Sequence, residues 1–269
     1  MSLESISPQA LRHYVQSHHE KAYLLVDVRQ PDEYRQSHIP GARLMPLPQL
    51  AQRLDELSAD KELVFYCHSG GRSMAAAVML EEQGHAGPIY NLTGGMLAWD
   101  GGRLADFPRV ALFKGQTAQE MFRTAINLEK GAQLFYEAVG RDFDGRTWSD
   151  TFVRLAKAEV AHAQTIHGFL KEIEPAVASF ESVYGNADGD VLEGGMTLAQ
   201  AMERLVPTQD ESCIRLVEMA LQIEYAAFDL YRTLADQTGA VQRPQAFIQL
   251  AQAEKAHMQA LITALDQCE

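Results

Sequence analysis

The stretch LVFYCHSGGRS, residues 63–73, predicts a buried strand that runs through a glycine-rich loop into a helix. Its first five residues form a continuous apolar run, which is typical of a strand covered on both faces. Strands and helices are expected to alternate on either side of this stretch, and such alternation predicts an α/β domain with a mostly parallel sheet. The other expected strands are 23–29, 43–47 and 88–92, and the expected helices begin at Ser7-Pro8 and after Pro31 and span 48–58 and 73–84.

The loop after this strand has the composition of an anion-binding site. A loop between a strand and a helix points successive backbone N–H groups into one concavity, and the helix N-terminus adds partial positive charge. Cys67 should therefore have a lowered pKa and react as a thiolate. Gly70 and Gly71 permit the tight curvature, and Arg72 adds a fixed positive charge. The alternative is that Cys67 only fills space at the end of a strand.

Residues 1–108 resemble a single-domain rhodanese. In that family the loop cysteine takes up a sulfane sulfur as a persulfide and passes it to a thiol or to cyanide. The related phosphatases have a loop one residue longer, so the six-residue loop disfavours a phosphate ester as substrate. The segments that carry the resemblance are LLVDVRQPDEYRQSHIPGA (24–42), CHSGGRS (67–73) and NLTGGMLAW (91–99).

This resemblance implies that Cys67 is the catalytic nucleophile, with a small sulfane-sulfur donor and a thiol acceptor as its reaction partners. Thiosulfate, a persulfide and a carrier protein all stay open as donors. Arg72 is expected to help hold the persulfide, and Asp27 and Arg29 to support the site. The expected substrate-binding loop consists of His68, Ser69, Gly70, Gly71, Arg72 and Ser73.

From about residue 117 the strand signals stop, and four long amphipathic helices are expected at 118–143, 148–173, 211–237 and 243–265. The connection between the second and third helices is long, and the other two are short. Such wiring predicts a ferritin-like four-helix bundle with one crossover. The expected organisation is a rhodanese-like α/β domain at 1–108, a linker at 109–117 and an all-α ferritin-like bundle at 118–269.

The bundle contains an internal repeat. LAKAEVAH (155–162) returns as LAQAEKAH (250–257), 95 residues later. In each half, a lone glutamate precedes the Glu-x-x-His motif by 30 residues. The second pair of helices therefore repeats the first. The residues matched by this offset are Glu129 with Glu224, Glu159 with Glu254, His162 with His257, and Tyr136 with Tyr231.

The four repeated glutamates lie in the middle of apolar stripes that should face the bundle core. A bare buried carboxylate costs several kcal/mol, and no lysine or arginine occupies these stripes. Two metal ions would balance the charge, and a carboxylate-rich set with imidazole favours iron, with manganese or a mixed pair as alternatives. The alternative interpretation is that the Glu-x-x-His pairs are ordinary charged surface residues at helical spacing. The expected ligands are Glu129, Glu159, His162, Glu224, Glu254 and His257, and Tyr136 and Tyr231 are expected to donate hydrogen bonds to them or to be core tyrosines.

Residues 118–266 resemble rubrerythrin-type ferritin-like proteins. The resemblance implies a non-haem di-iron centre that reduces peroxide or reacts with dioxygen, and a homodimer formed through the bundle. Rubrerythrins have another glutamate three residues after the third-helix glutamate, where this chain has Ala227. They also usually have a rubredoxin iron site with C-x-x-C pairs, which this sequence lacks, so an external electron donor protein is expected.

Composition limits the remaining classes of function. The formal net charge of −13 argues against non-specific nucleic-acid binding. No apolar run approaches the roughly 18 residues of a membrane helix, and the N-terminus does not resemble a signal peptide, so a cytoplasmic location is expected. The three cysteines predict free thiols in a reducing compartment, with Cys213 in the core and Cys268 on the surface.

The sequence thus predicts a bifunctional protein, a sulfurtransferase joined to a di-iron oxidoreductase. One alternative is an iron-sequestering bundle with the rhodanese domain as a sulfur sensor or partner adaptor. Another is a helical dimerisation scaffold with no metal.

Overall fold

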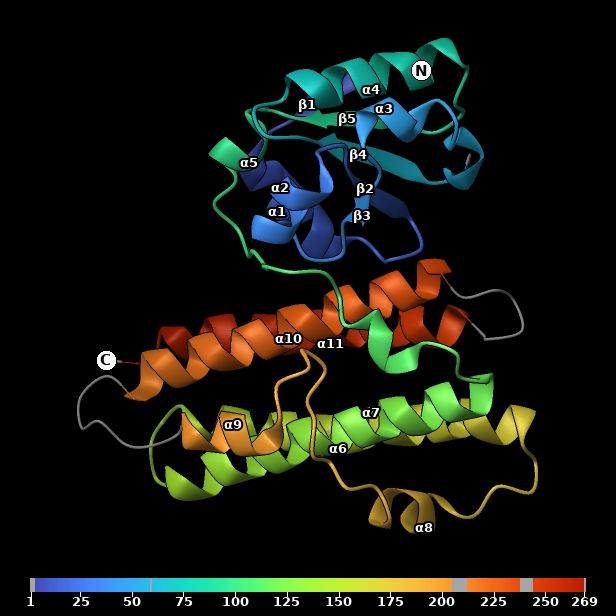
Figure 1. Cartoon of the computed structure of the whole chain (residues 1–269). Coiled ribbons are helices and arrows are strands. Elements are labelled where there is room, and N and C mark those ends of the chain that lie inside the picture. The colour runs from blue at the N-terminus through green and yellow to red at the C-terminus, as the bar shows by residue number, and fades with distance from the viewer. Residues whose placement is uncertain (1–2, 59, 205–211, 238–243, 269) are drawn as a thin grey trace. The chain divides into compact units, whose positions relative to one another are not determined.

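The computed structural model describes residues 3–58, 60–204, 212–237 and 244–268. The chain divides into two compact units, Met1–Phe107 and Pro108–Glu269, which are described separately (Figure 1). Glu211 and Arg243, the first residues of two of the expected helices, lie outside the described residues.

The first unit is built on a five-stranded sheet in the order β1-β5-β4-β2-β3, with every neighbouring pair parallel. This arrangement confirms the expected α/β domain. The strands are β1 (Leu3–Ile6), β2 (Tyr23–Asp27), β3 (Arg43–Leu44), β4 (Glu62–Tyr66) and β5 (Ile89–Leu92). The helices are α1 (Pro8–Ser17), α2 (Pro31–Gln36), α3 (Leu47–Leu50), η1 (Leu54–Glu56), α4 (Gly71–Glu82) and α5 (Gly95–Ala98).

Helices cover this sheet on both faces because consecutive apolar residues in its central strands, such as 63–66 of β4, place apolar side chains on both sides. Alternate residues of β4 point to opposite sides, as the pleat requires. Leu63 and Phe65 pack in one core cluster with the α4 residues, whereas Val64 and Tyr66 pack in the other with Leu11 of α1. The continuous apolar run in the sequence therefore corresponds to two hydrophobic cores, one on each face of the sheet.

Three details differ from the sequence-based expectation. β1 was not expected, because this edge strand buries only its last residue and contains no apolar run. The strand expected at 43–47 is only two residues long, and Pro46, which has no N–H to donate, follows it closely. The helix expected at 48–58 is divided between α3 and the 3-10 turn η1.

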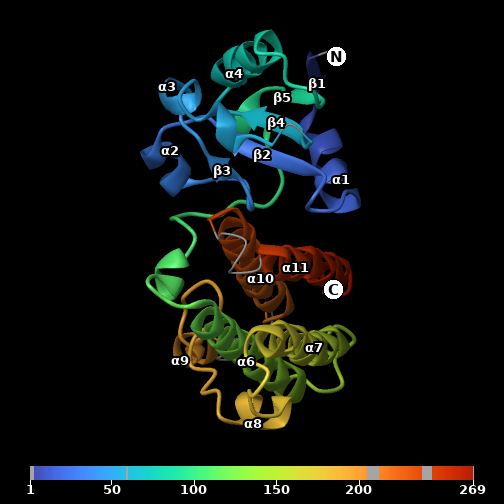
Figure 2. The ribbon, with the colours of Figure 1, turned by 90° about the vertical axis from the view of Figure 1, so that its right-hand side faces the viewer.

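The second unit is largely helical, as expected, and contains four long helices. These pack around two apolar clusters, and the pairs α6/α7 and α10/α11 are the most extensively packed neighbours (Figures 1 and 2). Among the described residues, no helix is both long enough and apolar enough to cross a membrane. The helices are η2 (Val110–Phe113), α6 (Ala118–Asp142), α7 (Ser149–Ile173), α8 (Phe180–Gly185), α9 (Leu198–Glu203), α10 (Ser212–Gln237) and α11 (Pro244–Leu265).

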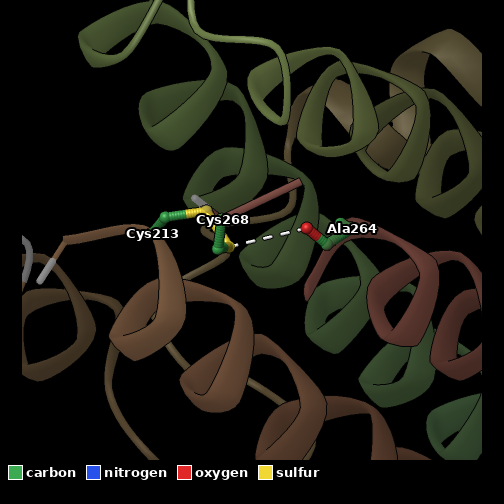
Figure 3. The surroundings of a disulfide bond; sticks show 3 residues. All are labelled: Cys213, Ala264 and Cys268. Atoms are coloured by element: carbon green, nitrogen blue, oxygen red, sulfur yellow. Dashed lines mark hydrogen bonds between the residues drawn. A yellow bond between two sulfur atoms is a disulfide. The ribbon is translucent and has the colours of Figure 1, made fainter. Parts of the chain in front are cut away.

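A disulfide joins Cys213 and Cys268, whose Cα atoms lie 5.4 Å apart (Figure 3). The sulfur of Cys268 also lies 3.5 Å from the carbonyl oxygen of Ala264. The expectation of three free thiols is therefore wrong for these two residues. They are 55 residues apart in sequence, but one lies at the start of α10 and the other just beyond α11, and the pairing of these helices brings them together.

Candidate functional site

The sulfur of Cys67 lies at the carboxyl end of β4, under the loop that leads into α4. The Sγ atom accepts hydrogen bonds from the backbone N–H of Gly70, at 3.1 Å, and from the hydroxyl of Ser73, at 3.4 Å. Gly70 has φ +99° and precedes the first residue of α4, so the loop requires glycine there. The loop and the first turn of α4 thus place two hydrogen-bond donors on the sulfur of Cys67.

These contacts favour the thiolate form of Cys67. Burial by itself raises the pKa of the thiol. The hydrogen bonds from Ser73 and from the backbone N–H groups of Ser69 and Gly70 have the opposite effect, and the net result is a pKa below the ordinary value. His68, Ser69 and Gly71 are exposed in the same loop. Cys67 is therefore buried, but neighbouring residues of the same loop are exposed to solvent.

A second segment, residues 91–99, packs against this loop and donates backbone hydrogen bonds to it. The backbone N–H of Met96 donates to the carbonyl of Cys67, at 2.9 Å, and that of Leu97 donates to the carbonyl of His68, at 3.0 Å. Gly95 lies so close that a Cβ atom there would be 2.3 Å from the Cys67 carbonyl oxygen. Its φ of +55° adds a second requirement for glycine. This positioning role was not recognised from the sequence.

Arg72 has a partner that the sequence analysis did not identify. Its guanidinium donates two hydrogen bonds to the carboxylate of Glu33 in α2, both at 2.7 Å. The paired guanidinium lowers the pKa of Glu33 to about 2. Arg72 therefore ties the active loop to α2, and its donors are directed at this carboxylate. Bidentate Arg–carboxylate geometry of this kind is characteristic of a fixed ion pair.

Asp27 and Arg29 lie beside the active loop, at the end of β2. Asp27 is aligned with Tyr66, the residue before Cys67. Arg29 donates to the Asp27 carboxylate through its side chain, with a closest distance of 2.6 Å, and to the carbonyl of Ser37. Both side chains are buried, so this ion pair stabilises the backbone at the end of β2.

Residues 11–101 match the family model of the Rhodanese-like domain. A putative sulfurtransferase, YtwF of Bacillus subtilis, is 37% identical over 101 residues, which cover 38% of this chain and 94% of that protein. The chain belongs to the rhodanese-like family.

Two further comparisons concern the same rhodanese-like part of the chain. A sulfurtransferase of Allochromatium vinosum is 43% identical over 76 residues, 28% of this chain and 70% of that protein. A rhodanese-like domain protein of Staphylococcus aureus with a solved structure is 28% identical and covers 38% of this chain and 98% of its own, with a TM-score of 0.35. The family match ends at residue 101, before the helical unit begins.

In the helical unit, four buried side chains converge between α7 and α11. They are the two Glu-x-x-His motifs, and one ligand atom from each lies within 4.8 Å of all the others. Glu159 lies 3.1 Å from Nδ1 of His162 and 3.2 Å from Nδ1 of His257. Glu254 likewise lies 3.4 Å and 3.1 Å from the same two atoms. Both motif glutamates therefore lie between the two histidines.

The two lone glutamates complete this arrangement from the other pair of helices. Glu129 of α6 lies 3.2 Å from Nδ1 of His162, and Glu224 of α10 lies 3.1 Å from Nδ1 of His257. A tyrosine of the opposite helix donates to each one. Tyr231 donates to Glu129, and Tyr136 donates to Glu224 at 2.5 Å. The structure thus brings all six expected ligands and both expected tyrosines together, although each tyrosine contacts the glutamate of the other repeat.

The histidines of this cluster and the protons retained by its lone glutamates offset the charge of its carboxylates. Burial alone would lower the pKa of His162 and His257, but the surrounding carboxylates raise it well above the ordinary value. Burial raises the pKa of Glu129 to about 8 and that of Glu224 well above its usual range. Two buried basic residues of α10 and α11 have other contacts: Arg232 is 3.7 Å from Asp236, and Lys255 lies over the ring of Phe228.

The donor set fits a pair of metal ions. Six oxygen- and nitrogen-bearing side chains meet within the core, and each Nδ1 atom of the two histidines lies within 3.2 Å of glutamate oxygens from two different helices. Carboxylate and imidazole ligands suit iron or manganese. His167 is not part of the cluster, because its Nε2 contacts the carbonyl of Ala178 at 2.9 Å. Another buried acid, Glu193, was not identified from the sequence, since it lies in the long connection, where no periodicity marks it.

Proposed function

We propose that the rhodanese-like domain transfers sulfane sulfur through a persulfide on Cys67. The observation that supports this proposal most directly is the environment of the Cys67 sulfur. It accepts hydrogen bonds from the Gly70 N–H and the Ser73 hydroxyl, and such bonds lower the pKa of the thiol. Relatives named as sulfurtransferases match over most of their length, which supports the same chemistry.

The reaction needs no outside oxidant or reductant. The Cys67 thiolate attacks the sulfane sulfur of the donor, and the bond between that sulfur and the rest of the donor breaks. With thiosulfate, sulfite leaves with the bonding electron pair, and Cys67 carries a persulfide. The backbone N–H groups of the loop stabilise the negative charge on the terminal sulfur. A thiolate or cyanide then attacks this sulfur, and Cys67 leaves as a thiolate.

The Cys67→Ser variant of the full chain tests this proposal, with thiosulfate and glutathione persulfide as donors and cyanide or a thiol as acceptor. The variant should lose sulfur transfer and should not gain the mass of one sulfur atom when treated with donor alone. Equal activity in the wild type and the variant would overturn the assignment of the nucleophile. A matched Ser5→Ala variant, in β1, should keep wild-type activity.

We propose further that the helical unit is a ferritin-like four-helix bundle of the rubrerythrin type that holds two metal ions, iron or manganese. The symmetric contacts of the cluster support this proposal. Glu129 with His162 would hold one ion and Glu224 with His257 the other, and Glu159 and Glu254, each within 3.4 Å of both histidines, would complete the ligand set.

Two redox-active ions would supply electrons to peroxide or dioxygen, and an external donor would return them. The chain's own residues orient the ligands and exclude water. Tyr231 and Tyr136 fix the orientation of the two lone carboxylates through hydrogen bonds. All six ligands are buried, with side chains such as Phe247 and Ala163 packed in the surrounding core. Only a small reactant is expected to reach such a site.

Metal analysis of the full chain after expression with iron and manganese tests the centre. Two ions per chain are expected in the wild type, and fewer than about one would overturn the proposal in favour of a helical scaffold. Repeated consumption of peroxide with an added electron donor would support the oxidoreductase. A single stoichiometric oxidation would instead support an iron-sequestering bundle, with the rhodanese-like domain as a sulfur sensor or adaptor.

A further inference from the structure

Glu193 lies in the connection between α8 and α9, in a turn that hydrogen bonds hold in a defined shape. The N–H of Leu192 donates to the carbonyl of Met196, at 2.9 Å, and the N–H of Gly195 donates back to Leu192, at 2.8 Å. Val191 and Thr197 form an antiparallel bridge at the base of the turn. The position of Glu193 is therefore set by the backbone.

This turn packs against α6 and α10, the helices that carry the two lone glutamates. A Cβ atom at Gly131 of α6 would lie 2.5 Å from the Val191 carbonyl oxygen, and one at Gly194 would lie 3.1 Å from the Cβ of Ala226 in α10. Gly131 and Ala226 each follow a lone glutamate by two residues. Glu193 thus enters the core between these helices, at the level of the metal cluster.

The side chain of Glu193 is buried, with 3% of its surface exposed, and its Oε2 atom has no hydrogen-bond partner. Burial, followed by the charges of Glu129 and Glu159 and then Glu254, raises its pKa well above the usual range. The charge of Glu193 also raises the pKa of the two tyrosines that hold the lone glutamates. The carboxyl group of Glu193 therefore lies close enough to interact electrostatically with the cluster and with its two tyrosines. A buried carboxylate oxygen without a partner requires an explanation.

We propose that Glu193 is a fifth carboxylate ligand of the metal centre, supplied by the crossover turn rather than by a long helix. The inference rests on the proposed metal centre. Four glutamates carry four negative charges, which two divalent ions balance. A fifth carboxylate matches a divalent ion paired with a trivalent one, so Glu193 stabilises the more oxidised centre.

The test compares the wild-type full chain with Glu193→Gln, which keeps the shape and removes the charge. Metal-free protein is titrated with Mn²⁺ and with Co²⁺, and thermal unfolding is measured with and without metal. We expect Glu193→Gln to weaken binding of at least one Mn²⁺ by about 10-fold or more. The Co²⁺ absorption spectrum should change because the coordination changes. The variant should melt above the wild type without metal and below it with metal, since an amide avoids the cost of burying a carboxyl group that is ionised in the unfolded chain but binds metal poorly.

Two further variants make the result specific. Glu203→Gln is the same chemical change at an exposed position of α9, and it should match the wild type in every measurement. Glu193→Asp keeps the charge but withdraws the carboxylate, and it should weaken Mn²⁺ binding less than Glu193→Gln does. This second substitution also serves if Glu193→Gln does not fold.

The outcomes separate this inference from the proposed centre. If the wild type binds two ions and Glu193→Gln has the same affinities and the same Co²⁺ spectrum, Glu193 is not a ligand and the centre stands. If the wild type binds neither Mn²⁺ nor Co²⁺, the centre is refuted and the inference with it. A melting difference of the same sign with and without metal would indicate a packing role and overturn the inference.

Discussion

Replacing Gly95 with alanine should disable the rhodanese-like site without touching any reacting atom. A Cβ atom at this position would lie 2.3 Å from the Cys67 carbonyl oxygen and 2.8 Å from the carbonyl carbon and oxygen of His68. All of these are backbone atoms of the active loop, so no flexible side chain can rotate out of the way. Relieving the overlap requires the loop or the segment at Gly95 to move.

The size of the effect follows from these distances. Because Cβ contacts shorter than 3.0 Å essentially do not occur, the backbone must shift by at least about 0.7 Å, the difference between 3.0 Å and 2.3 Å. Misplacing catalytic groups by about 1 Å can cost about 100-fold in rate, so sulfur transfer should fall by roughly 10- to 100-fold. The left-handed φ of +55° adds about 1–2 kcal/mol of destabilisation for any residue with a Cβ.

Gly84 offers a matched control for the backbone effect. Its φ of +78° is similarly left-handed, but a Cβ there would meet nothing within 4 Å. Gly84→Ala should therefore show a comparable loss of stability and a wild-type kcat/KM. The assay is formation of thiocyanate from thiosulfate and cyanide by the full chain, together with thermal unfolding. If Gly95→Ala has the same kcat/KM as Gly84→Ala, the packing of residues 91–99 does not position the Cys67 loop, and the reasoning is refuted.

Three other outcomes are expected. Ser73→Ala removes a hydrogen bond that lowers the pKa of Cys67, so the midpoint of its alkylation rate against pH should move upward, and an unchanged midpoint would contradict this account. Tyr231→Phe should weaken Mn²⁺ binding by about 10- to 100-fold, whereas Tyr225→Phe, in the same helix and half-buried, should bind as the wild type does. Removing the disulfide, which joins residues 55 apart, should lower the free energy of unfolding by about 4 kcal/mol. The melting midpoint of the helical signal should then fall by about 8–16 °C. Equal midpoints with and without the bond would show that it does not restrain the unfolded chain.

The sequence by itself determined the features that depend on local spacing. Continuous apolar runs such as 63–67 mark strands buried on both faces, and the loop after that strand contains the glycines its curvature needs. The 95-residue offset and the helical period place Glu159 and His162 on one face of a helix, because residues three apart are neighbours there. The six expected metal ligands follow from this regularity.

Only the tertiary structure decided which residues meet across elements. Tyr231 donates to Glu129, 102 residues away, and Arg72 pairs with Glu33 of α2. Local periodicity specifies the face of a helix but not the helix that packs against it, so such pairings emerge only when the elements assemble.

The same reason accounts for the remaining differences. The disulfide depends on the start of α10 lying beside the end of α11. Glu193 lies in a connection without a periodic pattern, and nothing local distinguishes it from the exposed acids of the same connection, such as Glu203. Its burial arises because the turn packs against Gly131 and Ala226, contacts that exist only in the folded unit.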